Sequence, residues 1–247
     1  MSDAIKTRPI LFSAPMVNAL LQGRKTQTRR KLPIQPTPNE SGTHTLWRRS
    51  VGSTNQEIKK SYDSAGTLLE ESTRIVPLGE WLLEKCPYRV GMQLWVRETF
   101  LLLDQHHWHD LSKPRESMIE AGAVSRRNGV AYRAETSADG EEIRSGYGYK
   151  WRPSIFMPRW ASRITLEITD VRVERLQEIS EEDAIAEGMR EFGTTGMFGY
   201  DLKGTPGPMV GGTAREAFAL LWGKINGPES WAANPWTWAI TFKGIQG

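Results

Sequence analysis

The residues with the clearest chemical potential form a basic run at residues 23–31. The run reads Gly-Arg-Lys-Thr-Gln-Thr-Arg-Arg-Lys and holds five cations in its last eight positions. Cations clustered on a loop that begins with a glycine suit a phosphate or another anion. A lysine near a threonine hydroxyl also forms a base–nucleophile pair if burial lowers the lysine pKa. A solvated basic loop explains the same pattern, so the residue types alone leave all three interpretations open.

A second candidate combines aromatic and basic side chains between residues 147 and 163. Its aromatic residues include Tyr149 and Trp151, and its cations include Arg152 and Arg159. Such mixtures suit stacked nucleobases and their phosphates. The alternative is that the tryptophans fill the core while the arginines lie outside it. The pattern does not decide between a nucleic-acid surface and an ordinary core edge.

The sequence offers little for a metal or a cofactor. His106, His107 and His109 form the only histidine cluster, and we expect a surface loop there rather than a metal site. The single cysteine, Cys86, excludes a cysteine-cluster zinc site and an internal disulfide. The glycine-rich phosphate loop, the dinucleotide loop, the serine elbow and the zinc-binding helix motif are all missing. We therefore expect no metal and no cofactor.

Composition bounds the class of protein. The chain has 247 residues, of which 38% are hydrophobic and 25% charged, as in a globular protein. The net charge of +3 is too small to make the whole surface a nucleic-acid ligand. No apolar run approaches the length of a membrane-spanning helix, and the amino terminus lacks the apolar run of a signal peptide. We expect a cytoplasmic protein without a membrane partner, and the oligomeric state stays open.

The elements that must position these residues are short strands and a few helices. Ser13, Ser180 and Thr213 are expected helix caps, and the glycines at 23, 188 and 227 are expected helix ends. The basic run should therefore follow the first helix as a loop. Long polar segments read as loop insertions at 34–74, 103–129 and 193–212, the last of which is glycine-rich and lid-like. Strands are expected at 8–12, 94–98, 131–134, 163–175 (with a bulge near 169–170) and 236–242.

These elements predict one α+β or barrel-like domain over residues 1–247.

The order of motifs and expected elements along the chain resembles the ASCH family of the PUA-like superfamily. The motif Gly23-Arg24-Lys25-Thr26-x-Thr28-x-Arg30 carries the resemblance, together with the glycine-led strand at 91–96, the segment 179–189 and the last strand. The resemblance implies a PUA-like β-barrel with short flanking helices and long loop insertions. The whole chain is similar to longer members of bacteriophages and prophages, which implies a host cytoplasm.

The family resemblance also implies a site. Its members are associated with RNA binding, and compact members that hydrolyse N4-acetylcytidine use a lysine, a threonine and a glutamate. These align with Lys25, Thr28 and Glu187, so Thr28 would attack the acyl carbon and Lys25 would take its proton. Arg30 would stabilise an oxyanion, and Arg24 would contact the ligand. The neighbouring arginines should lower the Lys25 pKa and Glu187 should raise it, and the sequence does not say which wins.

The resemblance leaves three activities open. The first is an amidohydrolase of N4-acylated cytidine, which we favour. The second is a module that binds RNA or modified DNA without chemistry, using the same pocket and the aromatic-basic stretch. The third is a ribonuclease in which Lys25 and Arg30 hold the scissile phosphate. All three predict a nucleoside or RNA, or modified DNA, as the partner.

Overall fold

A computed structural model gives the structure of the chain. It describes residues 5–33, 35, 37–38, 45–46, 56–62, 68–75, 82–102, 130–136, 150–193, 196–200 and 209–245. The His106–His109 cluster and Tyr149 lie outside the described residues, as does the expected insertion at 103–129.

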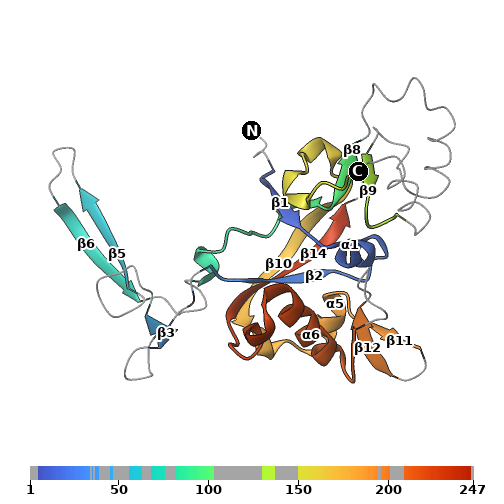
Figure 1. Ribbon diagram of the computed structural model, residues 1–247. Helices are drawn as coiled ribbons and strands as arrows, with labels where there is room; N and C mark the ends of the chain where they lie inside the picture. The colour runs from blue at the N-terminus through green and yellow to red at the C-terminus, as the bar shows by residue number, and fades with distance from the viewer. Residues whose placement is uncertain are drawn as a thin grey trace.

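A five-stranded sheet forms the centre of the molecule (Figure 1). Its strands, in spatial order, are β1 (Thr7–Leu11), β7 (Gln93–Arg97), β10 (Thr165–Arg175), β14 (Trp236–Ile245) and β2 (Gln27–Lys31). The first pair is parallel and the other pairs are antiparallel. Among the described strands no pairing joins β1 to β2, so this sheet is open. The mixture of helix and strand agrees with the expected α+β class, whereas the PUA-like barrel stays an expectation.

The bend expected near Thr169 is present in the longest strand pair. The register between β10 and β14 shifts between Ile168 and Asp170. Before the shift Ile168 is buried, and after it Val171 packs against the same core. A bulge explains why the hydrophobic alternation of the sequence slips by one residue at this point.

Smaller sheets correct two sequence expectations. The segments 34–74 and 193–212 were expected to be loops, but both contain strands. A polar segment still forms a hairpin when two extended stretches within it can pair. The strand pairs are β3 (Thr37–Pro38) with β4 (Thr45–Leu46), β5 (Gln56–Tyr62) with β6 (Leu68–Ile75), and β8 (Phe100–Leu102) with β9 (Val130–Tyr132). A three-stranded sheet joins β11 (Arg190–Phe192), β12 (Met197–Tyr200) and β13 (Met209–Gly211).

The helices begin and end where their capping residues predict. Ser180 Oγ accepts a hydrogen bond from the Asp183 amide, and Thr213 Oγ1 accepts one from the Glu216 amide. Each such cap contributes about 1 kcal/mol. The helices are α1 (Ala14–Leu21), α5 (Glu181–Ala186) and α6 (Ala214–Asn226), with 3-10 turns η2 (Ser154–Phe156), η3 (Arg159–Ala161), η4 (Leu176–Glu178) and η5 (Pro228–Ser230). No helix in the described ranges is long and apolar enough to cross a membrane.

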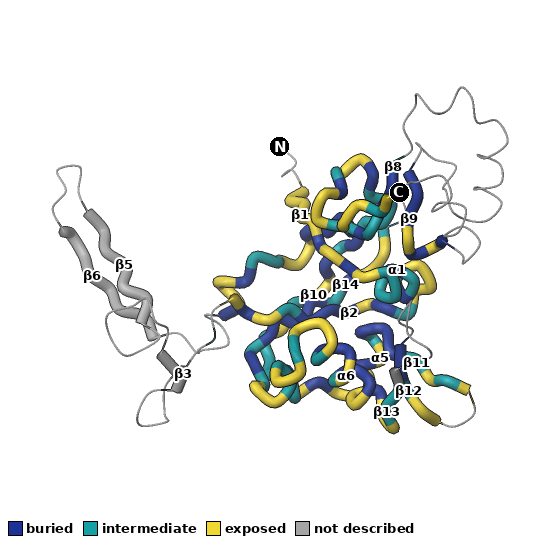
Figure 2. The backbone as a smooth tube through the Cα atoms, viewed as in Figure 1, coloured by how far each residue is buried: buried dark blue, intermediate teal, exposed yellow. Residues whose placement is uncertain are grey.

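The buried residues form cores on and beside the central sheet (Figure 2). The largest one packs α1 on the sheet through Val17, Leu94 and Ile240. A second core lies between α5 and α6, where Ala184 and Phe218 are buried. Strand β2 runs beside both cores, so its side chains are held from two sides.

The basic run begins as the expected loop at residues 23–26, but from Gln27 onward it is a strand. Residues Gln27–Lys31 form β2, which pairs with β14. Gln27, Thr28 and Arg29 are all buried. A cation-rich segment enters a sheet only when its charges find partners, and the partners of Arg29 come from distant parts of the chain. The sequence around residue 29 does not show them.

Candidate functional site

The segment that carries Lys25 is fixed by the ends of two helices. Helix α1 ends at Leu21 and is closed two residues later by Gly23, whose φ is +71°. The amides of Arg24 and Lys25 then donate to the Ala19 carbonyl, at 2.9 and 3.0 Å. The Thr26 amide donates to Ala186 at the end of α5, at 2.8 Å. Lys25 is therefore held between the carboxyl ends of α1 and α5.

Gly188 allows this close approach. Its φ is +105°, and a Cβ at this position would lie 3.1 Å from the Ala19 Cβ and 3.5 Å from the Lys25 Cβ. Any other residue would be strained by the backbone angle and crowded by α1. The glycine that ends α5 therefore brings the preceding residue, Glu187, against Lys25.

Lys25 and Glu187 form a buried ion pair. Lys25 Nζ lies 2.7 Å from Glu187 Oε2 and also donates to the Glu187 carbonyl at 2.8 Å. Both residues are 2% exposed. The Phe12 ring, whose centre is 5.5 Å from Lys25 Nζ, covers the ammonium group. The structure therefore brings together the lysine and glutamate that the ASCH resemblance pairs.

Burial lowers the pKa of Lys25 below its ordinary value. The loss of hydration is the largest effect, and the Glu187 carboxylate opposes it. Arg30 and Arg29 lower the pKa further, although by less. The net direction favours the neutral amine, which is the form that can accept a proton.

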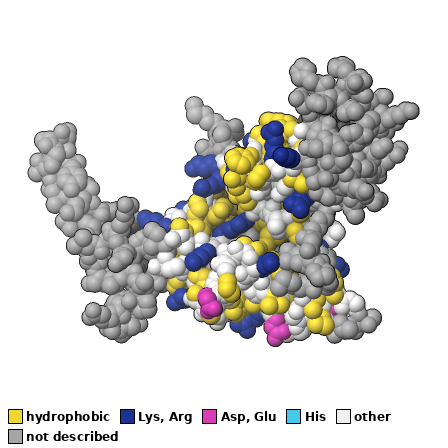
Figure 3. All heavy atoms as spheres, in the orientation of Figure 1, with side chains coloured by type: hydrophobic (Ala, Val, Ile, Leu, Met, Phe, Trp, Pro, Cys, Tyr) yellow, Lys and Arg dark blue, Asp and Glu magenta, His cyan; other side chains and the backbone are white. Residues whose placement is uncertain are grey.

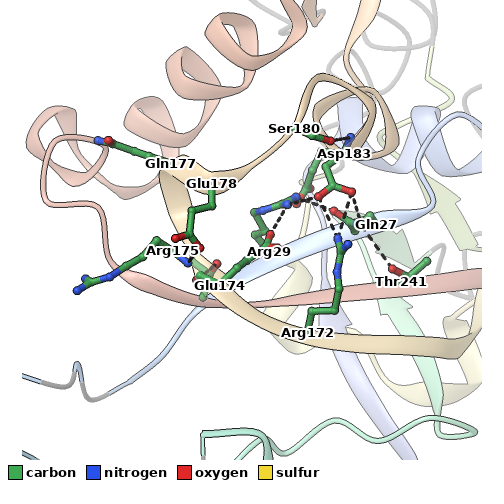
Figure 4. A network of polar contacts seen from close by, with 12 residues as sticks. Gln27, Arg29, Arg172, Glu174, Arg175, Gln177, Glu178, Ser180, Asp183 and Thr241 are labelled. Atoms are coloured by element: carbon green, nitrogen blue, oxygen red, sulfur yellow. Dashed lines mark hydrogen bonds and ion pairs between the residues drawn. The ribbon is translucent and has the colours of Figure 1, made fainter. Parts of the chain in front are cut away.

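Arg29 joins the pair to a wider network of ions (Figure 4). Its Nη1 lies 3.5 Å from Glu187 Oε1, and its Nη2 lies 2.7 Å from Asp183 Oδ2 and also contacts Glu174. Asp183 and Glu187 are four residues apart, so they lie on one face of the short helix. Arg29 thereby fixes α5 to β2 at two places.

Asp183 is the centre of this network. Figure 4 shows Gln27, Arg29 and Arg172 pointing toward its carboxylate, each with a hydrogen bond. Burial tends to raise the pKa of Asp183, but the hydrogen bonds from Arg29 and Gln27 lower it overall. The carboxylate is consequently ionised at neutral pH, as the cations around it require.

Thr28 lines a cavity of about 390 Å³, which we call the Thr28 cavity. Its volume lies in the range of small-molecule sites, about 300–1,000 Å³. Glu187 lines the same cavity, together with aromatic side chains from the residue that follows β1 and from α6. The aromatic members are Phe12, Phe218 and Trp222. The cavity therefore offers flat apolar walls beside a hydroxyl and a carboxylate.

Three polar atoms of residues that line this cavity are buried without a hydrogen-bond partner in the described structure. They are Glu187 Oε1, Arg30 Nε and Trp222 Nε1. A buried polar group without a partner costs about 1–3 kcal/mol. One acceptor and two donors of this kind beside one cavity indicate a polar ligand that supplies the missing bonds.

Arg30, which the resemblance implies as a ligand contact, lines the Thr28 cavity. Its Nη2 donates to the Leu11 carbonyl at 2.7 Å, and its guanidinium lies 5.3 Å from the centre of the Phe12 ring. Burial lowers the pKa of Arg30, but an arginine still carries its charge at neutral pH. A fixed cation is thus present at the wall that holds Thr28.

Arg24 lines a different cavity of about 500 Å³, which we call the Arg24 cavity. The two cavities adjoin, because Ser13, Met16, Glu187 and Leu221 line both. Arg24 Nη1 donates to the Gly188 carbonyl at 2.9 Å, which fixes its guanidinium at the wall. The structure thus separates Arg24 from Thr28 and Arg30 by a shared wall.

The aromatic-basic stretch does not join either cavity through its expected residues. Trp151 is half-buried, whereas Arg152 and Arg159 are exposed and absent from the described walls of both cavities. The same segment reaches the Thr28 cavity through Ser154. The described residues hold no group of three potential metal ligands close enough for an ion.

Several residues of the site were missed in the sequence. Phe12 ends the strand expected at 8–12, and Trp222 lies in the helix expected between Thr213 and Gly227, but neither was identified as a site residue. Arg29 is one of five similar cations in the basic run, and Asp183 was read only as a capping residue.

Comparisons with protein-family models, curated proteins and solved structures return no match.

Proposed function

We propose that the Thr28 cavity binds an N4-acylated cytidine and that the protein hydrolyses its amide bond. The observation that carries the proposal is that Thr28 and Glu187 line one cavity while Lys25 contacts Glu187 directly. Nucleophile, carboxylate and lysine are the three groups that the ASCH resemblance implies. Their types also fit amide hydrolysis by a threonine nucleophile.

The flat part of the ligand has matching walls. The rings of Phe12, Phe218 and Trp222 line the cavity and suit a planar base. A cytosine ring carries a carbonyl oxygen and a ring nitrogen that accept hydrogen bonds. Arg30 Nε and Trp222 Nε1 are donors that find no partner within the described part of the chain. The amide N–H of an acylated cytidine complements Glu187 Oε1, an acceptor that has no hydrogen-bond partner among the described residues. An unmodified cytidine would present the same edge without the acyl group.

The reaction then follows from the groups in place. Thr28 Oγ1 attacks the acyl carbon, and its proton passes to the neutral amine of Lys25. The carbon–nitrogen bond breaks, the cytosine amine takes that proton, and the acyl group remains on Thr28 as an ester. A water molecule hydrolyses the ester and restores Thr28. Glu187 holds Lys25 in place throughout, and the Arg30 cation stabilises the oxyanion.

The test is release of cytidine from N4-acetylcytidine, followed by chromatography. We expect turnover by the wild type and a loss of about 10³-fold or more in Thr28→Val, which keeps the shape of the side chain without its hydroxyl. Thr26→Val is the matched control, because Thr26 is the exposed threonine two residues away and does not line the cavity. Equal turnover by Thr28→Val and the wild type would exclude Thr28 as the nucleophile. No cytidine release by the folded wild type would overturn the activity.

A second candidate function is binding of single-stranded nucleic acid at η2 and η3. Phe156 is 67% exposed and Trp160 is 59% exposed, beside the exposed cations Arg152 and Arg159. Figure 3 shows hydrophobic side chains next to Lys and Arg side chains over this part of the surface. Exposed aromatics with cations are the pattern that stacks bases and contacts phosphates.

This candidate is tested by the affinity for a fluorescent RNA or DNA oligonucleotide at several salt concentrations. Stacking of one base contributes about 1–3 kcal/mol, so Trp160→Ala should weaken binding by about 5–150-fold. Val90→Ala is the control, because Val90 is similarly exposed and lies on another element. Unchanged affinity in Trp160→Ala would remove the surface from consideration.

A further inference from the structure

The Arg24 cavity differs in chemistry from the Thr28 cavity that it adjoins. The cations in its described wall are Arg24 and Arg190, and its uncharged polar members include Asn18, Gln22 and Tyr200. The only carboxylate in that described wall is Glu187. The Arg29 guanidinium already lies 3.5 Å from its Oε1. The described wall therefore brings two guanidinium groups to one cavity beside a carboxylate that already has a cationic neighbour, and guanidinium groups suit an anionic ligand.

The cations of this cavity are held in place by the fold. The Arg24 guanidinium is fixed by the Gly188 carbonyl and by Gln22, whose Oε1 accepts two hydrogen bonds at 2.9 and 2.7 Å. The Arg190 guanidinium lies 3.9 Å from the centre of the Phe192 ring. Fixed guanidinium groups lose little freedom when they bind a phosphate, and their planar donors match its oxygens.

The two cavities share the wall that contains Glu187, between α1 and α5. Both described walls contain cations, but the rings of Phe12, Phe218 and Trp222 line the Thr28 cavity alone. We propose that one ligand occupies both cavities, with its base against Thr28 and a phosphate monoester beside Arg24 and Arg190. The ligand class is then a nucleotide, or a nucleotide at the end of a chain, rather than a free nucleoside. This inference rests on the proposed base site and assigns the second cavity to it.

The proposal is tested by calorimetric titration of the wild type with cytidine, cytidine 5′-monophosphate and cytidine 3′-monophosphate. Charge-assisted hydrogen bonds to the phosphate should make one monophosphate bind at least about 10-fold more tightly than cytidine. The two monophosphates distinguish the position of the phosphate on the sugar. A higher salt concentration should reduce the difference in affinity between the monophosphate and cytidine, because this difference depends on charge.

Variants test whether the tighter binding of the monophosphate comes from the Arg24 cavity. Arg190→Gln should remove most of the advantage of the monophosphate and leave the affinity for cytidine unchanged. Arg215→Gln is the matched control, because Arg215 is an exposed arginine on α6 outside the described walls of both cavities. Arg24→Gln is a second variant of the same wall.

The outcomes separate this inference from the proposed function. Equal affinities of the wild type for cytidine and both monophosphates would overturn the phosphate site and leave the base site standing. An advantage that persists in both Arg190→Gln and Arg24→Gln would also overturn it. Failure to hydrolyse N4-acetylcytidine, with the phosphate advantage intact, would overturn the activity alone. No binding of any of the three ligands would overturn both.

Discussion

Lys25 contacts Glu187 at two points of the same residue, the carboxylate at 2.7 Å and the backbone carbonyl at 2.8 Å. The second contact does not depend on the charge of the glutamate. A neutral amine can keep both contacts, because each oxygen accepts a hydrogen bond from N–H. The arrangement therefore holds Lys25 in one position in both protonation states, as a proton acceptor requires.

The first prediction concerns Glu187→Gln and the pH dependence of turnover. The rate should rise with pH as Lys25 loses its proton, with a midpoint below the ordinary lysine value of 10.5. Glu187 raises the Lys25 pKa, so removal of its charge should move the midpoint to lower pH. The measurement is kcat/KM for N4-acetylcytidine against pH in both proteins. A midpoint that stays in place or moves upward would contradict the role of this pair.

The second prediction concerns Asp183→Asn, which weakens the ion network beside the site. Asp183 has a lowered pKa, so its contribution to stability is present above about pH 3.8 and is lost as the pH falls through the lowered value. The variant should lose about 1.5–3 kcal/mol of unfolding free energy at pH 7, as for hydrogen bonds to charged groups. The difference from wild type should shrink in acid. Urea unfolding at pH 7 and pH 3 measures both effects.

Glu182→Gln is the control for this experiment. Glu182 precedes Asp183 on α5 and is exposed, so the substitution removes a charge of the same sign from the same helix. The free energy of unfolding of Glu182→Gln should equal that of the wild type. If Asp183→Asn and Glu182→Gln have the same free energy of unfolding at pH 7, the network in Figure 4 contributes no stability.

The third prediction concerns a second buried ion pair, which lies away from the site. Arg163 binds both oxygens of Glu98, at 2.8 and 3.0 Å, and also contacts Glu135. Burial raises the pKa of Glu98, and Arg163 opposes the shift. Arg163→Met should therefore destabilise the protein by about 3 kcal/mol at neutral pH, because it leaves a buried carboxylate unpaired.

The sign of the pH effect distinguishes this pair from Asp183. A carboxyl with a raised pKa binds its proton more tightly in the folded state, so stability falls as the pH rises through that pKa. The loss in Arg163→Met should thus be small below pH 4.5 and largest above it. The double variant Glu98→Gln/Arg163→Met should recover part of the loss at pH 7. A loss that is independent of pH would point to packing instead.

Local signals in the sequence predicted much of the fold. The caps at Ser180 and Thr213 are set by residues three positions apart, and the bulge near Asp170 follows from a slip in alternation within one strand. The glycine at 188 was predicted as a helix end, and its positive φ confirms this. These features depend on neighbours in the chain, which is why a single sequence contains them.

The missed features depend on contacts between distant residues. Arg29 enters a strand because Glu174, Asp183 and Glu187, about 150 residues away, neutralise it. No local pattern distinguishes it from the other cations of the run. The cavity walls are likewise formed by segments from distant parts of the chain, so the sequence did not identify Trp222 as a site residue.

The fourth prediction concerns Trp222→Phe, which removes the indole N–H and retains an aromatic ring. Trp222 is 5% exposed, lines the Thr28 cavity, and has no hydrogen-bond partner for Nε1 among the described residues. Because the free protein leaves this donor unsatisfied, its removal should not reduce the thermal stability by the amount that a lost hydrogen bond costs. Ligand affinity should nevertheless fall, since the ligand is expected to supply the acceptor.

Paired measurements test this prediction. Thermal unfolding should place Trp222→Phe close to the wild type, and titration with cytidine should show an affinity lower by about 3–10-fold, as for one neutral hydrogen bond. Trp231→Phe is the control, because Trp231 packs on the same core and does not line the cavity. If Trp222→Phe lowers stability and leaves cytidine binding unchanged, the indole belongs to the core alone, and the donors for the base must come from Arg30.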